Sequence, residues 1–134
     1  NDVELALKYI DEHVVYRIPG RSMIAGEFRG IAKYQFALRR ARELSGNTLS
    51  LQPYSVLADD ERLLIYGRIR AEREGRQLDS DHCVMFRFVG GRIVEGRTIP
   101  VDQYAFDLFW APRAPDVAGD RERSAVGGVS AQRK

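Results

Sequence analysis

The sequence predicts a single α+β domain, a curved antiparallel sheet wrapped by helices around an apolar pocket. Three features carry this prediction. Over residues 31–44 the apolar side chains keep a spacing of three to four, which is typical of a helix. After residue 47 the spacing changes to two, which is typical of strands. Glycine-containing turns at residues 74–75 and 89–91 separate alternating segments, as in β-hairpins.

The composition limits the class of protein. The 134 residues are 44% hydrophobic and 30% charged, which suits one globular domain with a core of its own. Lys and Arg number 21 against 19 Asp and Glu, a balance too even to indicate a nucleic-acid or membrane partner. No apolar run approaches the roughly 20 residues of a membrane-spanning helix.

Cysteine and histidine usage bears on redox and metal chemistry. Cys83 is the single cysteine, so neither an intrachain disulfide nor a multi-thiolate metal site can form, and a cytoplasmic location is expected. The two histidines, His13 and His82, are far apart and lack ligand spacing. We therefore expect no metal and no cofactor.

The first third of the chain is predicted to hold two helices and a strand. Residues 2–13 are interpreted as a helix, with Asp2 as its N-cap. Residues 14–18 form a β-branched strand that ends at a Pro-Gly turn, and residues 21–29 form a loop. A second helix over residues 31–44 ends at Gly46, which suits a left-handed cap.

Four strands and a short helix are predicted to follow. Pro53 interrupts the strand over residues 48–57, which indicates an edge or bulged strand. The remaining predicted strands cover residues 63–73, 77–89 and 92–101, and Asp102 caps a closing helix over residues 103–110. The domain is thus expected over residues 1–111, and residues 112–134, rich in Pro, Ala, Gly and Ser, are expected to be a disordered tail.

Hairpin geometry predicts which side chains face the pocket. A two-residue turn at residues 74–75 pairs Gly67 with His82, and a three-residue loop at residues 89–91 pairs His82 with Thr98 and Phe86 with Val94. The inner face then holds Ile65, Gly67, Ile69, Leu78, Ser80, His82, Val84, Phe86, Phe88, Val94, Gly96 and Thr98. The outer face holds Arg68, Arg70, Asp81, Cys83, Met85, Arg87, Glu95 and Arg97.

Two inner-face glycines, Gly67 and Gly96, flank His82 and Val84 in this arrangement. They can form the floor of a cavity, or they can allow the sheet to bend and pack closely. The two interpretations are compatible, because a bent sheet makes a concave surface. Tyr34, on the helix over residues 31–44, is a further candidate for the pocket lining.

Four motifs resemble the nuclear transport factor 2-like superfamily. Residues 14–20 (VVYRIPG) and 24–30 (IAGEFRG) are similar to its N-terminal part. Residues 90–95 (GGRIVE) and 102–110 (DQYAFDLFW) are similar to the end of its SnoaL-like branch, which includes polyketide cyclases and to which ketosteroid isomerases and limonene epoxide hydrolases are related. The resemblance implies a cone-shaped, cystatin-like α+β roll. It also implies a long first helix over the open end, for which the chain has no room, so the chain is truncated or the pocket is closed differently.

The resemblance implies catalytic residues for each related enzyme class, and these can be compared with the residues that this chain has at the matching positions. An isomerase needs a carboxylate base, but Arg17 stands near that position and Val84 at the inward acid position. The positions of an epoxide hydrolase's acid–arginine–acid set hold Ile65, Gly67 and Thr98. Neither activity is expected.

A cyclase-type reaction fits better. It uses one carboxylate as acid and base on an apolar carbonyl compound, and the resemblance places Asp102 in that role, with His82 and Arg17 as polar helpers. Two of these residues have a simpler interpretation, Asp102 as a helix cap and His82 as a hydrogen-bonded core residue.

The alternative function is a non-catalytic ligand-binding or dimerisation module of the same fold. The scarcity of inward carboxylates favours it. The expected partners are an apolar small molecule and a second copy of the chain, bound through the outer sheet face. In such a homodimer Arg68, Arg70, Arg87 and Arg97 would pair with Asp81 and Glu95 across the interface.

Overall fold

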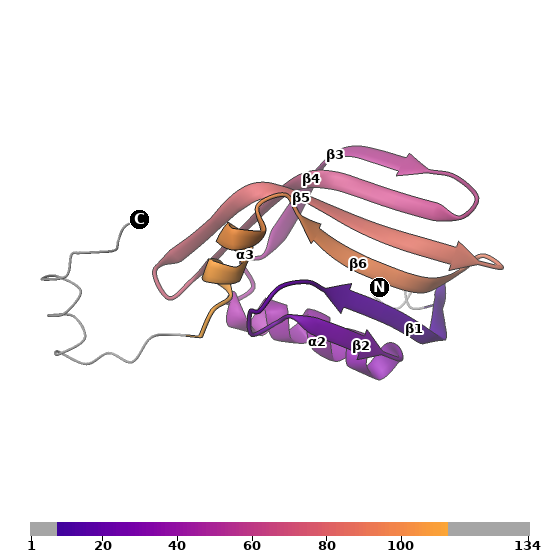
Figure 1. The fold of residues 1–134 in the computed structure, drawn as a ribbon, viewed down its shortest axis with the longest axis horizontal. Helices are drawn as coiled ribbons and strands as arrows, with labels where there is room; N and C mark the ends of the chain where they lie inside the picture. The colour runs from indigo at the N-terminus through magenta and orange to yellow at the C-terminus, as the bar shows by residue number, and fades with distance from the viewer. Residues whose placement is uncertain (1–7, 113–134) are drawn as a thin grey trace, which may run out of the picture.

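Six strands form one curved sheet in the order β2-β1-β6-β5-β4-β3 in the computed structural model, which describes residues 8–112. The elements are β1 (Ile10–Ile18), β2 (Gly26–Arg29), α2 (Ile31–Leu44), β3 (Ser50–Ala58), β4 (Arg62–Arg73), β5 (Arg76–Val89), β6 (Arg92–Pro100) and α3 (Gln103–Phe109). Figure 1 shows β3–β6 as one half of the molecule and β1, β2 and α2 as the other. The α+β class predicted from the sequence is confirmed.

The strands β3, β4, β5 and β6 form an antiparallel meander. Between β4 and β5 the predicted register is confirmed, with Gly67 opposite His82 and Ala71 opposite Leu78. Glu74 and Gly75 both have positive φ, 50° and 78°, as a two-residue hairpin turn requires. Pro53 lies on the edge strand β3 at a register irregularity, as its missing N–H predicts.

The predicted pairing of β5 with β6 is wrong by two residues. Phe86 lies opposite Gly96, not Val94, and His82 lies opposite Pro100, not Thr98. The cause is a shorter turn, Gly90-Gly91, followed by an irregularity between Arg87 and Phe88. Beyond the irregularity the shift is two residues, which preserves the face of each side chain, so His82 and Thr98 are both buried inside as expected. Between the irregularity and the turn the shift is one residue, so Phe88 lies opposite Ile93, which packs against the core in place of Val94.

The helix predicted over residues 2–13 is wrong where the structure can test it. Residues 10–13 belong to β1, and the rest of that range before residue 8 lies outside the described residues. The register between β1 and β6 shifts between Ile10 and Val15, which leaves Glu12 and His13 exposed and Ile10 and Val14 buried. This irregularity produces a four-residue apolar spacing that resembles a helix.

Other boundaries differ less. The predicted loop over residues 21–29 contains the short edge strand β2, whose polar sequence carries no alternation. The predicted helix over residues 31–44 is confirmed, and Gly46 has the expected positive φ of 58°. The expected C-terminal tail lies outside the described residues except for Pro112.

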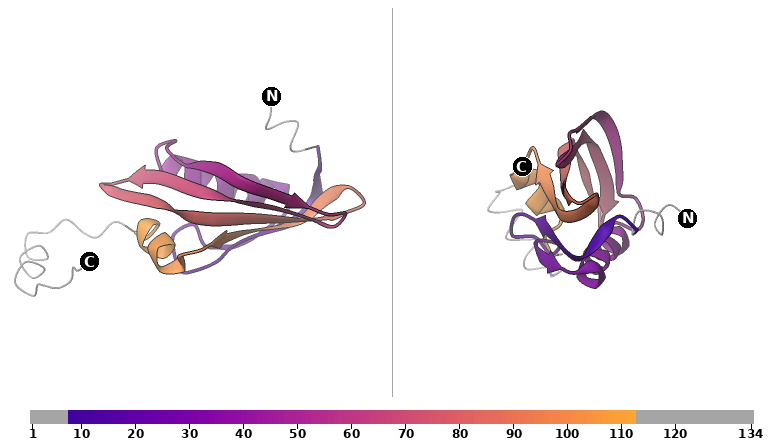
Figure 2. Two further views of the ribbon diagram at one scale, coloured as in Figure 1. Left: turned by 90° about the horizontal axis from the view of Figure 1, so that it is seen from above. Right: turned by 90° about the vertical axis from the view of Figure 1, so that its right-hand side faces the viewer.

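The meander joins the N-terminal unit through one parallel ladder, between β1 and β6, where Arg17 pairs with Arg97. The core lies between the inner face of the sheet and the two helices. It includes Tyr34, Ala37 and Ala41 of α2, and Phe106 of α3 with Trp110 just beyond it. Figure 2 shows α3 at one end of the long strands. No helix within residues 8–112 is long and apolar enough to cross a membrane.

Both inner-face glycines permit close packing. A Cβ on Gly67 would lie 2.3 Å from the backbone oxygen of Gln52 on β3. A Cβ on Gly96 would lie 2.7 Å from the ring of Tyr16. The space that the two glycines leave is therefore filled, by a strand in one case and by an aromatic ring in the other, and the cavity-floor interpretation is wrong for both.

Candidate functional site

An interior cavity of about 200 Å³ lies between the sheet, α2 and α3. Its walls are almost entirely apolar, as is usual for sites that bind small organic molecules. The lining residues are Tyr16, Ile18, Ile24, Ala37, Leu38, Ala41, Leu49, Ser50, Leu51, Ile69, His82, Val84, Thr98, Phe106 and Trp110.

A pair of hydroxyl groups joins β1 to β6 in the cavity wall. Tyr16 and Thr98 face inward from neighbouring parallel strands, and their side-chain oxygens are 2.6 Å apart. Tyr16 is 5% exposed, and burial raises the pKa of its phenol well above the ordinary value. The phenol is therefore protonated at any physiological pH and can serve as a hydrogen-bond donor.

His82 presents a neutral imidazole to the cavity. It is 3% exposed on β5, and its ring stacks on Phe106 with centroids 5.8 Å apart. Burial lowers the pKa of His82 from 6.5 to about 4, because desolvation disfavours the charged imidazolium form. Its Nδ1 atom is buried and has no hydrogen-bond partner within the described residues.

Trp110 is the single tryptophan of the chain and is 1% exposed. Its ring packs edge-on against Phe106 and Phe109 of α3. The indole Nε1 is buried and, in the part of the chain that the structure describes, finds no acceptor. An indole nitrogen can only donate, so this atom requires an acceptor from elsewhere.

Two arginines of the β4–β5 hairpin hold α3 and Trp110 in place. The buried Arg73 donates from Nη1 to the carbonyl oxygens of Phe109, at 2.8 Å, and Ala111, at 2.9 Å. Arg76 donates to the Ala111 oxygen at 2.7 Å. Cationic groups at a helix C-terminus also stabilise the helix dipole.

The structure places some predicted lining residues in the cavity and others outside it. Ile69, Val84 and Thr98 line the cavity, as does His82. The other predicted lining residues, Ile65, Gly67, Phe86, Val94, Gly96 and Tyr34, do not. Tyr16, Tyr34 and Phe86 pack as a ring cluster, with centroids 4.9 and 6.5 Å apart, that fills the space beside the cavity.

The predicted set of Asp102, His82 and Arg17 is not brought together. Asp102 is exposed and caps α3, accepting the Ala105 N–H at 3.0 Å. Arg17 points away from the core, since the neighbouring Tyr16 on the same strand points into it, and pairs with Glu27 and Glu95. Only His82 of the three lines the cavity.

Sequence reasoning overlooked Tyr16 and Trp110. The alternation of Val14, Tyr16 and Ile18 carried a signal, because it places all three on one face of a strand. For Trp110 the sequence offered only the residue type and its place at the end of the short helix, which do not predict a position in the cavity wall.

The lining contains no carboxylate, and its polar groups are hydroxyls, an imidazole and an indole N–H. In residues 8–112, no three His, Cys, Asp or Glu side chains come close enough to hold a metal ion. The chemistry available in the cavity is hydrogen bonding and proton transfer by the one histidine.

Comparisons with known proteins agree on the fold. The family model described as a SnoaL-like domain matches residues 1–96. The chain is 30% identical over 95 residues to the uncharacterised protein Rv0034 of Mycobacterium tuberculosis, covering 70% of this chain and 72% of the relative.

Two solved structures are similar over most of their length. Bal32a, from a soil-derived mobile gene cassette, has a TM-score of 0.76 and 34% identity, covering 81% of this chain and 84% of its own. A Xanthomonas campestris protein of unknown function with a cystatin-like fold has a TM-score of 0.76 and 25% identity, covering 83% and 87%.

Proposed function

Because the chain belongs to the SnoaL-like domain family of the nuclear transport factor 2-like superfamily, we propose that its interior cavity binds a small, apolar molecule with a hydrogen-bond acceptor. One observation carries this proposal. Trp110 and His82 line the cavity, and their Nε1 and Nδ1 atoms are buried without partners in the described structure. Leaving a buried polar atom unpaired costs roughly 1–3 kcal/mol, so a ligand oxygen that meets the indole N–H stabilises the complex.

The cavity volume and lining narrow the ligand. About 200 Å³ is below the roughly 300–1,000 Å³ of drug-sized sites. The absence of a lining carboxylate or arginine disfavours a charged ligand, because an unpaired buried charge is costly. A monocyclic ketone fits both limits.

Trp110 offers a direct test. Because it is the single tryptophan, its fluorescence reports cavity binding. Cyclohexanone should change the emission and bind more tightly than methylenecyclohexane, which has the same shape without the oxygen. In Trp110→Phe, followed by NMR, this preference should fall roughly fivefold, the value of one neutral hydrogen bond.

Tyr54→Phe is the matched control, because it removes an exposed hydroxyl on the opposite face of the sheet. It should leave both affinities unchanged. Equal affinity for the ketone and the hydrocarbon in the unmodified protein would contradict the proposal.

A second candidate function is acid–base chemistry on an apolar carbonyl compound, of the isomerase or cyclase type. His82 favours it, because a neutral imidazole can accept a proton at physiological pH. A pKa of about 4 makes His82 a weak base, so the substrate would need an activated C–H, as between two carbonyl groups.

Deuterium exchange tests this candidate separately from binding. His82 would take the C–H proton, the electron pair would form an enolate, and a deuteron from solvent would be returned. In D₂O the protein should speed exchange at the activated carbon of a cyclic β-keto ester, and His82→Gln should remove the effect. His13→Gln, at the exposed second histidine, should not. Exchange no faster than in buffer would leave ligand binding as the function.

A further inference from the structure

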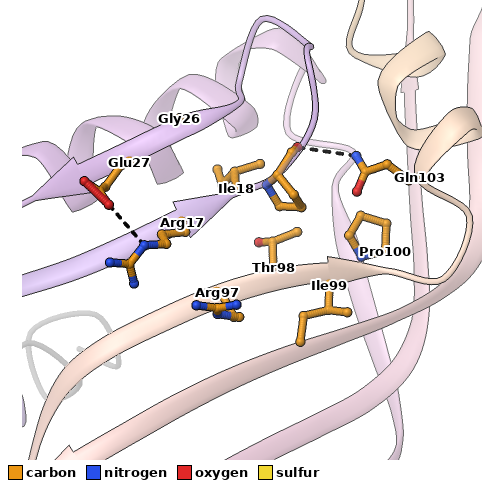
Figure 3. Close-up of a pocket in the computed structure, with 10 residues that line it drawn as sticks. Arg17, Ile18, Gly26, Glu27, Arg97, Thr98, Ile99, Pro100 and Gln103 are labelled. Carbon is orange, nitrogen blue, oxygen red and sulfur yellow. Dashed lines mark hydrogen bonds and ion pairs between the residues drawn. The ribbon is translucent and has the colours of Figure 1, made fainter.

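A second concave site lies outside the core, where β1 and β6 separate. The ladder between these strands ends at Arg17 and Arg97, and beyond that pair the chains diverge. The resulting groove has a volume of about 540 Å³. Figure 3 shows Arg17 from β1 and Arg97 from β6 beside the same opening.

The groove is cationic at one end. Arg17 and Arg29 share Glu27, with closest distances of 3.1 and 2.8 Å. Arg17, Arg87 and Arg97 share Glu95. Four guanidinium groups therefore share two carboxylates, so two positive charges are not compensated in this cluster.

Arg97 is the least satisfied member of the cluster. Its Nη2 is 4.0 Å from Glu95, the longest of these contacts, and its Nε is buried with no partner in residues 8–112. Arg87 by contrast donates from Nε to Glu95 at 3.1 Å. A guanidinium group binds a carboxylate in a bidentate way through two neighbouring N–H donors, and the Arg97 side chain, 44% exposed, lines the groove.

Besides Arg17, Arg97 and the carboxylate of Glu27, which pairs with Arg17, the groove is lined mainly by apolar groups, with Thr98 and Gln103 as its other polar side chains. Ile18 and Pro19 form one wall and Ile99 and Pro100 the other, and Gln103 closes the far end by hydrogen bonds to Pro19 and Asp107. Inorganic phosphate would leave these apolar walls exposed to water, whereas the apolar part of an organic anion would bury them.

We propose that this groove binds an organic carboxylate, whose acid group pairs with Arg97 and Arg17 and whose apolar body lies between Ile18 and Ile99. The groove and the interior cavity share Ile18 and Thr98 in their linings. They differ in charge, because only the groove is lined by Arg17 and Arg97.

Phenylacetate is a suitable probe, titrated by NMR at low salt with phenylacetamide as its neutral counterpart. The acid should shift the amide signals of Arg97, Thr98 and Ile99 and bind at least about fivefold more tightly than the amide. Arg97→Gln should weaken phenylacetate roughly tenfold, and Arg97→Lys should weaken it less, because the charge remains.

Arg70→Gln is the charge-matched control, since Arg70 is an exposed residue of β4 that faces Asp79. It should leave the affinity unchanged. Equal losses in Arg70→Gln and Arg97→Gln would overturn the proposal, since they would indicate general charge attraction. Equal binding of phenylacetamide, or of inorganic phosphate, would also overturn it.

Discussion

At the scale of single residues, His82 couples the stability of the fold to pH. Its pKa is about 4 in the folded protein and near 6.5 when the chain is unfolded. Between these two pH values the unfolded chain binds more protons than the folded protein, so the free energy of unfolding rises with pH. The stability that the neutral His82 contributes is lost as the pH falls through this window.

We therefore expect the free energy of unfolding to drop by about 2 kcal/mol between about pH 7.5 and about pH 5. Urea titrations monitored by Trp110 fluorescence measure this. His82→Gln should remove most of the histidine-linked part of the slope, whereas His13→Gln should keep it, because His13 is exposed. Equal slopes in the unmodified protein and His82→Gln would contradict the assignment.

Residue type and period predicted the inward position of His82, but they could not separate the two roles of Asp102. A carboxylate that follows a strand and precedes a helix fits both an N-cap and an acid–base group. Only the contact with the Ala105 N–H decides that Asp102 acts as a cap. Arg17 was misassigned for a similar reason, because a resemblance in motif does not report which face of a strand a side chain takes.

At the scale of elements, the β4–β5 hairpin positions α3 through Arg73. The Arg73 side chain is 3% exposed, and its guanidinium binds carbonyl oxygens at the C-terminal end of that helix. Since α3 carries Phe106 and leads into Trp110, this contact holds the part of the cavity wall that these two side chains form.

We expect Arg73→Gln to lower the free energy of unfolding by roughly 2–4 kcal/mol, because buried carbonyl groups lose a charged donor. Hydrogen exchange should accelerate in α3 more than in β4 and β5. Arg70→Gln, on the same strand but exposed, should change the free energy by no more than about 0.5 kcal/mol. Uniform acceleration across the domain would argue against a local role of Arg73.

The meander and α2 were predictable because regular alternation and a regular helical spacing repeat over nine or more residues. The strand β1 was not, because its irregular register against β6 breaks the period of two. The cavity itself depends on what fills the space left by Gly67 and Gly96, the backbone of β3 in one case and the ring of Tyr16 in the other, and these are long-range contacts absent from any local pattern.

At the scale of the whole molecule, a homodimer through the outer sheet face stays a prediction. The charged pairs expected across the interface are largely satisfied within the chain: Arg68 binds Asp79 at 2.6 and 2.7 Å, and Arg87 binds Glu95. The remaining attraction of this face lies in exposed aromatic groups of β3 and β4, Tyr54 and Tyr66.

Light scattering at tens of micromolar should therefore report a dimer. Tyr66→Asp should convert it to a monomer, because a charge would be buried at the interface. Phe36→Asp, at an exposed position of α2 on the other side of the sheet, should leave the dimer intact. A monomeric unmodified protein would contradict the prediction.

The parallel ladder between β1 and β6 has a consequence for the order of folding. β3 to β6 can pair by successive short hairpins, but Tyr16 must find Gly96 across most of the domain. Closing so long a loop is entropically slow, so the first strand should dock last, after the last strand is in place. During synthesis the N-terminal unit would then wait for β6 to be made, and the apolar side of β1 would be exposed in the meantime.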